Sequence, residues 1–141
     1  MRVFDSEKIM SFLIDTNILI YRLKNVGNVN SNFLKNQHFP MSISAISYGE
    51  LVFGAEKSQN REKNLKTVEA IRAIFPIEGG GDARVMEVFG QTKAFLQKSG
   101  MIVDDMDLMI VSTALANNMT LVTHNTKHFV HILGLSLEDW F

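Results

Sequence analysis

Short apolar runs alternate with longer amphipathic segments along most of this chain, and that alternation constrains the fold more than any other feature. Strand-like runs are expected at residues 12–14, 41–44 and 120–123, with a last short strand within residues 131–141. The segments between them repeat apolar residues at helical spacing. Strands that alternate with helices favour an α/β fold in which most strands of the central sheet are parallel.

Six segments carry their apolar residues on one helical face. Within residues 60–75, for example, Leu65, Val68 and Ile71 recur at this spacing opposite a charged face. Gly100 follows the segment 82–99 as a helix-terminating residue. The helices are therefore expected at residues 16–24, 28–37, 47–58, 60–75, 82–99 and 105–118.

The charge balance and the absence of cysteine exclude several kinds of protein. Fourteen Lys and Arg against fifteen Asp and Glu give a net charge of -1, so any contact with nucleic acid must use a local patch and not bulk charge. Without cysteine, disulfides, thiolate metal sites and a cysteine nucleophile are excluded. No signal peptide or membrane-spanning run is evident, which predicts a cytoplasmic protein without a membrane partner.

Three acidic residues stand at the predicted junctions between strands and helices. Asp15 directly follows the first strand, and Glu50 lies in the first turn of the helix expected over residues 47–58. Asp107 lies in the first turn of the helix that begins near Asp105. Open α/β sheets place their ligand sites at the carboxyl ends of the strands. If these strands are neighbours, the three carboxylates are therefore expected to converge at one edge of the sheet.

Each acid also has a purely structural explanation. Asp15 can cap the helix that begins at Thr16, Ser47 and Glu50 form the S-x-x-E pattern of a capping box, and Asp107 can complement a helix dipole. Gathered in one place, however, carboxylates repel one another unless a cation neutralises them. An all-oxygen set selects hard ions such as Mg²⁺, and such an ion can activate water and polarise a phosphodiester.

Five segments of the chain together resemble the VapC toxins, a group within the PIN-domain family. They are LIDTNILIY at 13–21, SISAISYGEL at 42–51, VDDMDLMI at 103–110, LVTHNTKHF at 121–129 and GLSLEDW at 134–140. They follow one another in the family's order, and the resemblance covers residues 10–141. Residues 1–9 are left as an N-terminal extension or a mis-assigned start.

The resemblance implies a three-layer α/β/α PIN-like domain over residues 10–141, with a mostly parallel central sheet. It also implies an endoribonuclease that depends on Mg²⁺ or Mn²⁺, acts as the toxin of a toxin–antitoxin pair and cleaves RNA, in characterised members often a tRNA. By match to the family's motifs, the catalytic metal ligands are Asp15, Glu50 and Asp107. The supporting residues are Thr16, Asn17 and Thr123. The Thr16 hydroxyl and the Asn17 amide are expected to orient Asp15 and bound water. The expected protein partners are a VapB-like antitoxin and a second copy of the chain.

The chain departs from the family's pattern around its last two acidic motifs. PIN domains often have a fourth acid where this chain has Asn125, and many relatives have another acid where it has His128. Asn125 keeps an oxygen ligand but loses a charge. Asp104 and Asp105 stand where others have Gly-Pro, close to Asp107. Asn125 and Asp105 are therefore additional candidate ligands, and the number of metal ions is left open.

The basic residues either form a solvent-exposed helix face or contact RNA phosphates. The candidates are Arg22, Lys24, Lys57 and Arg61, with Lys63 and Lys66 on the same run. Two other functions are left open by the sequence. One is a PIN-like module that binds its partner or RNA with little or no cleavage. The other is a nuclease that acts on DNA, because the same metal chemistry serves both nucleic acids.

Overall fold

One parallel sheet of five strands lies at the centre of the protein, whose computed structural model describes residues 10–79 and 81–141. The strand order is β3-β2-β1-β4-β5, and each neighbouring pair is parallel. The strands are β1 (Phe12–Ile14), β2 (Met41–Ser44), β3 (Ile77–Glu78), β4 (Thr120–Val122) and β5 (Ser136–Glu138). The predicted extension at residues 1–9 lies outside the described residues.

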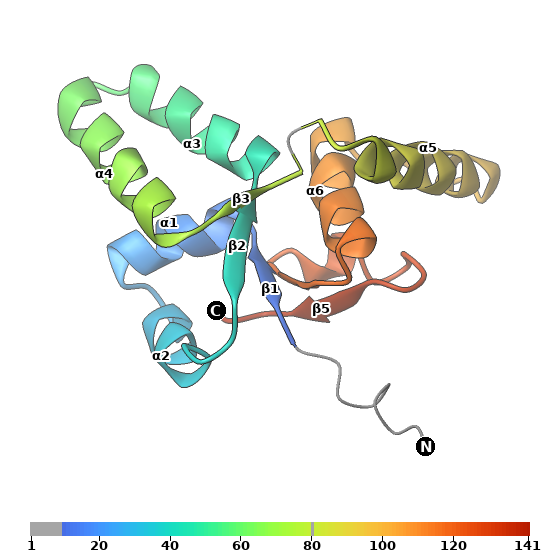
Figure 1. Ribbon diagram of the computed structural model, residues 1–141, viewed down its shortest axis with the longest axis horizontal. Helices are drawn as coiled ribbons and strands as arrows, with labels where there is room; N and C mark the ends of the chain where they lie inside the picture. Colours follow the sequence, from blue (N-terminus) through green and yellow to red (C-terminus); the bar gives the residue numbers. More distant parts are fainter. Residues whose placement is uncertain (1–9, 80) are drawn as a thin grey trace.

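Six α-helices and one short 3-10 helix surround the sheet in the described part of the chain. They are α1 (Thr16–Lys24), α2 (Val29–Lys35), α3 (Ala45–Glu56), α4 (Arg61–Ile74), α5 (Ala83–Lys98), α6 (Asp105–Ala116) and the 3-10 helix η2 (Thr126–His128). Helices α1 to α4 cover one face of the sheet and α5 and α6 the other (Figure 1). The predicted three-layer α/β/α architecture is therefore confirmed. None of the described helices is long and apolar enough to cross a membrane.

The central strand β1 divides the hydrophobic core into two halves. Phe12 and Ile14 pack with the apolar side chains of α1 to α4, whereas Leu13 packs with those of α5 and α6. All three side chains are fully buried, as expected for a strand of a parallel sheet that is covered on both faces. Because β1 is fixed from both sides, the residue that follows it, Asp15, leaves the sheet at a defined position.

The start of α3 differs from the prediction. The helix begins at Ala45 and not at residue 47, because Ser44 is its N-cap and the Ser44 hydroxyl accepts the backbone N–H of Ser47 at 2.9 Å. The predicted capping box between Ser47 and Glu50 is therefore wrong, and Glu50 lies in the second turn of α3. The serine that ends β2 also starts the next helix, so no loop separates the two elements. Glu50 is consequently free to take part in other interactions.

The strand β3 has no counterpart in the sequence prediction. It contains two residues, too few to show an alternation of side chains. Its position follows from pairing with β2, in which Ile43 is opposite Ile77 and donates its backbone N–H to the carbonyl of Pro76 at 2.9 Å. The other predicted helices and strands have ends within two residues of those observed.

The end of the chain packs against α1 and α2. Trp140 is buried, with its ring centroid 5.0 Å from that of Phe12 and 5.1 Å from that of Phe33. The carbonyl of Phe141 accepts the backbone N–H of Asn28 at 2.6 Å. The last strand and the end-piece around Trp140, both expected from the sequence, are confirmed.

Replacing Gly27 by alanine is expected to destabilise this closure. Gly27 has a φ of +60°, and an added Cβ would lie 2.7 Å from the Phe141 carbonyl oxygen. The left-handed conformation alone costs a residue with a Cβ about 1–2 kcal/mol. Urea denaturation is expected to show a loss of at least that size in the free energy of unfolding.

Gly90→Ala is the matched control for this substitution. Gly90 lies within α5, and open space surrounds the position of an added Cβ. Alanine there is expected to raise the free energy of unfolding by roughly 0.5–1 kcal/mol, because glycine is a poor helix former. Equal effects of the two substitutions would contradict the described contact between Gly27 and Phe141.

Candidate functional site

The three acidic side chains that the sequence analysis singled out lie at the carboxyl edge of the sheet, close enough for their charges to affect the pKa of Asp15 and of Asp107. Asp15 follows β1 and caps α1. Glu50 lies in the second turn of α3, the helix that follows β2, and Asp107 lies in the first turn of α6. Burial raises the pKa of Asp107, the negative charges of Asp15, Asp104 and Glu50 raise it further, His128 lowers it, and the net change is upward. The three predicted ligands therefore share one electrostatic environment.

Asp15 is the buried member of the site, with 8% of its surface exposed. Its Oδ1 accepts the backbone N–H of Thr16 at 2.8 Å, and its Oδ2 accepts the hydroxyl of Thr123 at 2.9 Å. Burial raises the pKa of Asp15, the two hydrogen bonds lower it, the charge of Glu50 raises it, and the net change is upward. A carboxylate that is fixed in place while its negative charge is disfavoured is well suited to bind a cation.

Two threonine hydroxyls connect the segments that carry the acids. The Thr16 hydroxyl donates to Oε1 of Glu50 at 2.6 Å, so it orients Glu50 and not Asp15 as the sequence comparison implied. The Thr123 hydroxyl, which donates to Asp15, also accepts the backbone N–H of Asn125 at 3.1 Å. One set of hydrogen bonds therefore joins the chain after β1, after β2 and after β4.

The remaining predicted site residues take less central positions. Asn17 is exposed on α1. Asn125 is exposed and precedes η2, and its side chain makes no capping hydrogen bond there. Asp105 already has a cationic partner, since Lys93 Nζ of α5 lies 3.0 Å from its Oδ1. A ligand role for Asn125 or Asp105 stays a prediction.

A histidine–aspartate pair beside the site was missed by the sequence analysis. Nδ1 of His124 lies 3.0 Å from Oδ2 of Asp139, and its ring stacks on Phe141 with the centroids 4.2 Å apart. His124 immediately follows Thr123, so the pair fastens this part of the site to the end of the chain. Both residues lie in segments that resemble the family, yet no local pattern signals a contact across fifteen positions.

Two pockets flank the acidic edge. The first, of about 190 Å³, has Thr16 and Glu50 at one end and is otherwise lined largely by apolar side chains of α1, α3 and α4. The second, of about 330 Å³, lies on the side of α6 and η2. It is lined by Ile102, Val103, Asp104, Asp107 and His128. The acids therefore lie between an apolar groove and a mixed pocket.

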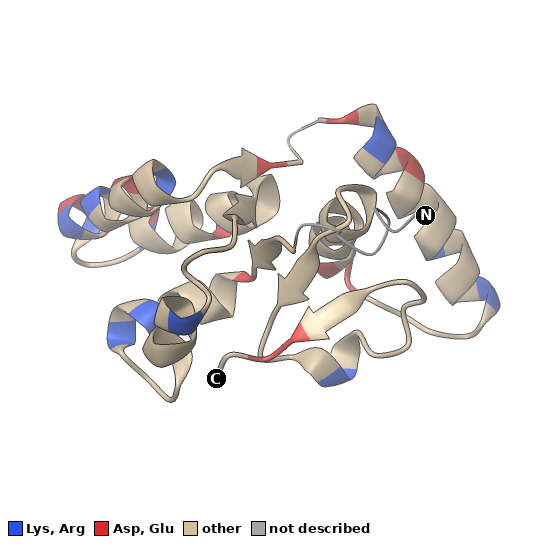
Figure 2. Cartoon of the chain, turned by 60° about the horizontal axis from the view of Figure 1, so that its bottom comes forward, with Lys and Arg blue, Asp and Glu red and all other residues tan. Residues whose placement is uncertain are grey.

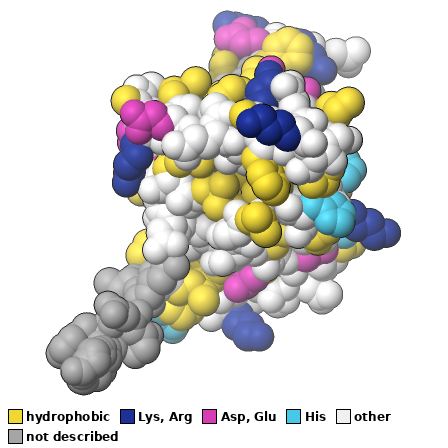
Figure 3. Space-filling model, turned by 90° about the vertical axis from the view of Figure 1, so that its right-hand side faces the viewer, with side chains coloured by type: hydrophobic (Ala, Val, Ile, Leu, Met, Phe, Trp, Pro, Cys, Tyr) yellow, Lys and Arg dark blue, Asp and Glu magenta, His cyan; other side chains and the backbone are white. Residues whose placement is uncertain are grey.

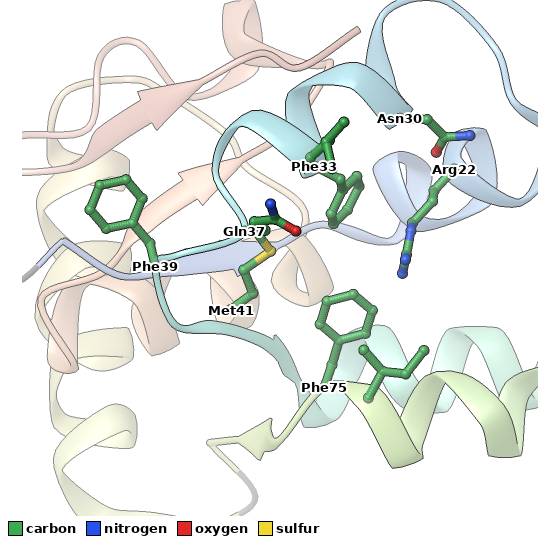
Figure 4. Close-up of a pocket in the computed structure, with 9 residues that line it drawn as sticks. Arg22, Asn30, Phe33, Gln37, Phe39, Met41 and Phe75 are labelled. Carbon is green, nitrogen blue, oxygen red and sulfur yellow. The ribbon is translucent and has the colours of Figure 1, made fainter.

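The candidate RNA-contacting Arg22 lies in a different pocket, of about 450 Å³ (Figure 4). Its guanidinium is 4.8 Å from the ring centroid of Phe33 and 5.5 Å from that of Phe75. Phe39 and Met41, at the amino end of β2, line the same pocket. Arg22 is thus placed toward the edge of the sheet opposite the acids.

The other basic candidates also make contacts of their own. Arg61 pairs with Glu56 at 2.6 Å, and the Lys57 ammonium lies 4.9 Å from the ring centroid of Phe53. Lys24 is exposed at the end of α1. Figure 2 shows the basic positions spread over several helices. None of the four candidates is among the residues that line the two pockets beside the acids, so their contact with RNA stays a prediction.

The chemistry of the site fits a hard divalent cation. Its donors are carboxylate oxygens, which Mg²⁺ and Mn²⁺ prefer, and burial first, with like charges adding to it, raises the pKa of both Asp15 and Asp107. In the described part of the chain, no group of three acidic or histidine side chains is already arranged to hold one ion. To share one ion, the three carboxylates would therefore have to move closer together.

Comparison with known proteins settles the family. The PIN-domain family model matches residues 12–132. The chain belongs to the PIN-domain family. This PIN-domain chain is 37% identical over 132 residues to the tRNA(fMet)-specific endonuclease VapC of Shigella flexneri, and the match covers 93% of this chain and 98% of that protein. It is 34% identical over 139 residues to Ribonuclease VapC1 of Haemophilus influenzae, with the same coverage.

Solved structures give the same answer. The chain matches the structure of VapBC2 from Rickettsia felis bound to a promoter DNA fragment, with a TM-score of 0.86, 31% identity and coverage of 94% of this chain and 100% of that one. DNA-bound VapBC from Salmonella typhimurium matches with a TM-score of 0.86, 34% identity and the same coverage. Within the PIN-domain family, the chain is therefore a member of the VapC group of ribonuclease toxins.

Replacing Asp107 by asparagine is expected to stabilise the metal-free protein at neutral pH. A raised pKa means that folding favours the protonated carboxyl group. Stability from this source is present below the ordinary pKa of 3.8 and is lost as the pH rises through the raised value in the folded protein. An uncharged amide avoids that loss, so the advantage of the variant should vanish in acid.

Urea denaturation in the presence of a chelator, between pH 3 and pH 8, measures this difference. Asp105→Asn is the matched control, because it removes a carboxylate that pairs with Lys93 and is expected to bring no gain in stability. A lower free energy of unfolding for Asp107→Asn than for the wild type at neutral pH would contradict the described crowding of charges.

Proposed function

We propose that this VapC-group protein is a metal-dependent endoribonuclease in which Asp15, Glu50 and Asp107 hold Mg²⁺ or Mn²⁺. The observation that supports this most is the meeting of three carboxylates from three separate elements at one edge of the sheet, where burial and mutual repulsion raise the pKa of two of them. The relatives named as ribonucleases and endonucleases support the same activity.

The three carboxylates are assigned different roles because they differ in burial and in hydrogen bonding. Asp15 is held through both of its oxygens and defines the position of the site. Asp107 lies on the first turn of the largely buried helix α6, whereas Glu50 is exposed and is oriented by Thr16. When bound, a divalent ion of this kind lowers the pKa of the attacking water and polarises the phosphodiester. Thr123 and Thr16 keep their two carboxylates aligned for that task.

RNA is the proposed substrate, and tRNA is the class that we favour. The relative from Shigella flexneri carries the name of a tRNA(fMet)-specific endonuclease, and it is similar to this chain over 98% of its own length. We place the activity in the cytoplasm, where tRNA is found. The net charge of -1 is compatible with this substrate, because a cation at the acidic edge neutralises the phosphate that is cut.

The apolar groove next to Glu50 is the surface that we assign to a VapB-like antitoxin. The matched structures from Rickettsia felis and Salmonella typhimurium are VapBC complexes. The groove is lined by Ile20, Leu23 and Leu51 among others, and it ends at Thr16 and Glu50. An apolar segment that carries one Arg or Lys would fill the groove and place its charge beside the carboxylates. Such a partner would block access to the site and compete with the cation for the carboxylates.

Self-association is proposed to use a second apolar surface. Phe95 of α5 is 47% exposed and Leu133 is 75% exposed, and both line a shallow pocket of about 160 Å³. Figure 3 shows hydrophobic side chains on the side of the molecule that α5 covers. A second copy of the chain is the occupant that we propose, because this surface is separate from the groove beside Glu50. The groove thus stays available to an antitoxin in a homodimer.

Purified, partner-free protein is expected to cut total RNA into discrete fragments when Mn²⁺ or Mg²⁺ is present and to lose this activity in EDTA. Asp15→Asn and Asp107→Asn are expected to lower the rate by more than about 100-fold, the upper end of what loss of an outer hydrogen-bond partner costs in metal sites. Thr123→Val is expected to lower the rate by about 10- to 100-fold, because Thr123 is an outer hydrogen-bond partner of Asp15.

Glu87→Gln on α5 is the control, since Glu87 is exposed and far in sequence from the acidic motifs. Equal cleavage by wild type and Asp107→Asn would contradict the proposal. Cleavage of DNA with intact RNA would indicate a DNA nuclease. Folded protein that binds Mn²⁺ and cuts neither would indicate a binding module.

A further inference from the structure

The pocket between α6 and η2 adjoins the acidic edge and shares Asp107 with it, but its other lining residues have no part in the proposed cation site. Its volume of about 330 Å³ lies at the lower end of the range for small-molecule sites, roughly 300–1,000 Å³. Its lining combines an apolar wall, one imidazole ring and two carboxylates. It opens on the opposite side of the acids from the groove that contains Thr16 and Glu50.

The apolar wall is formed by residues just before α6. Ile102 is 96% exposed, and the neighbouring Val103 is half-buried. A single exposed isoleucine is unremarkable on a protein surface. Here, however, it lines the same pocket as the imidazole ring of His128, so a flat molecule that enters the pocket would meet both an apolar side chain and an aromatic ring.

The aromatic side of the pocket is His128. It is the last residue of η2, and its ring packs edge-on against Phe129, with the centroids 6.3 Å apart. Phe129 is only 3% exposed and belongs to the core, so it provides a fixed support for the imidazole. The ring nitrogens of His128 have no hydrogen-bond partner among residues 10–79 and 81–141. His128 therefore offers a supported aromatic ring close to the acidic edge.

The carboxylates give the pocket a preference among flat ligands. Asp104 uses its Oδ2 to accept the backbone N–H of Met106 at 3.1 Å, and Oδ1 makes no hydrogen bond within the described chain. A free carboxylate oxygen accepts hydrogen bonds from amino groups and repels carbonyl oxygens. Cytosine, adenine and guanine carry exocyclic amino groups, whereas uracil has carbonyl oxygens in their place.

We propose that this pocket binds one unstacked nucleobase next to the phosphate that is cut, with its ring stacked on His128 and its amino edge facing Asp104. The inference rests on the proposed ribonuclease function. Sequence-specific recognition of RNA uses bases that are splayed out of single-stranded loops and stacked on aromatic side chains, which is the arrangement this pocket can accommodate. A free anion is disfavoured there, because two of the lining residues are acidic.

The first test compares His128→Ala with His128→Phe in the cleavage of RNA oligonucleotides that differ in the base beside the cut. Stacking of a base on an aromatic side chain contributes about 1–3 kcal/mol, so His128→Ala should lower kcat/KM by roughly 5- to 150-fold, mainly through KM. His128→Phe should keep most of the wild-type value, because it preserves the ring. His131→Ala, also exposed and three residues away, should change nothing.

Asp104→Asn tests the preference for amino groups. Asparagine is as good an N-cap as aspartate, so α6 should keep its start. The wild type should disfavour uracil at this position, and the variant should lose that discrimination. Equal cleavage by His128→Ala and wild type, or rescue by His128→Lys but not by His128→Phe, would overturn the proposal, because the second outcome indicates a role for charge.

A binding measurement separates this inference from the proposed function. In metal-free protein, the imidazole NMR signal that is missing in His128→Ala is expected to shift on addition of cytidine or adenosine and to stay in place with uridine. Such a shift in a protein that cuts no RNA would support nucleobase binding in the pocket and overturn the proposed ribonuclease function. No shift with any of these nucleosides would overturn the pocket, whatever the activity.

Discussion

The hydrogen bond from the Thr123 hydroxyl to the buried carboxylate of Asp15 is the interaction on which the rest of the site depends. It exists because β1 and β4 pair in parallel with Ile14 opposite Val122, so the chain leaves both strands at the same level. A buried carboxylate without such a partner is costly. The sheet therefore both places Asp15 and provides the group that makes its burial tolerable.

The same placement makes this edge of the sheet better suited to a cation than to an anion. Asp15 has little room to move, Asp107 lies at the start of a packed helix, and Glu50 is oriented by Thr16. Their charges raise one another's energy, and the raised pKa of Asp15 and of Asp107 reports that cost, in addition to the cost of burial. Part of the stability of the fold is thus given up at the site, and under the proposed function a bound divalent ion would restore it.

The sequence predicts the site better than it predicts the contacts that support it. Positions at the junctions of predicted strands and helices single out Asp15, Glu50 and Asp107, and resemblance to the family gives them the role of candidate metal ligands. The Ser44 cap was assigned to Ser47, because a strand that runs directly into a helix has no loop to mark its boundary. The pair of His124 with Asp139 and the strand β3 depend on residues that meet only after the chain has folded, so no local pattern reveals them.

The most direct measurement is anomalous X-ray diffraction at the manganese edge, from crystals of the partner-free protein grown with Mn²⁺. A shared cation site predicts a strong anomalous peak within coordinating distance of carboxylate oxygens from Asp15, Glu50 and Asp107. The peak should be absent in crystals of Asp107→Asn or much weaker there. A fully occupied Mn²⁺ ion elsewhere on the protein, with this edge of the sheet empty, would contradict the assignment of these three residues as one metal site.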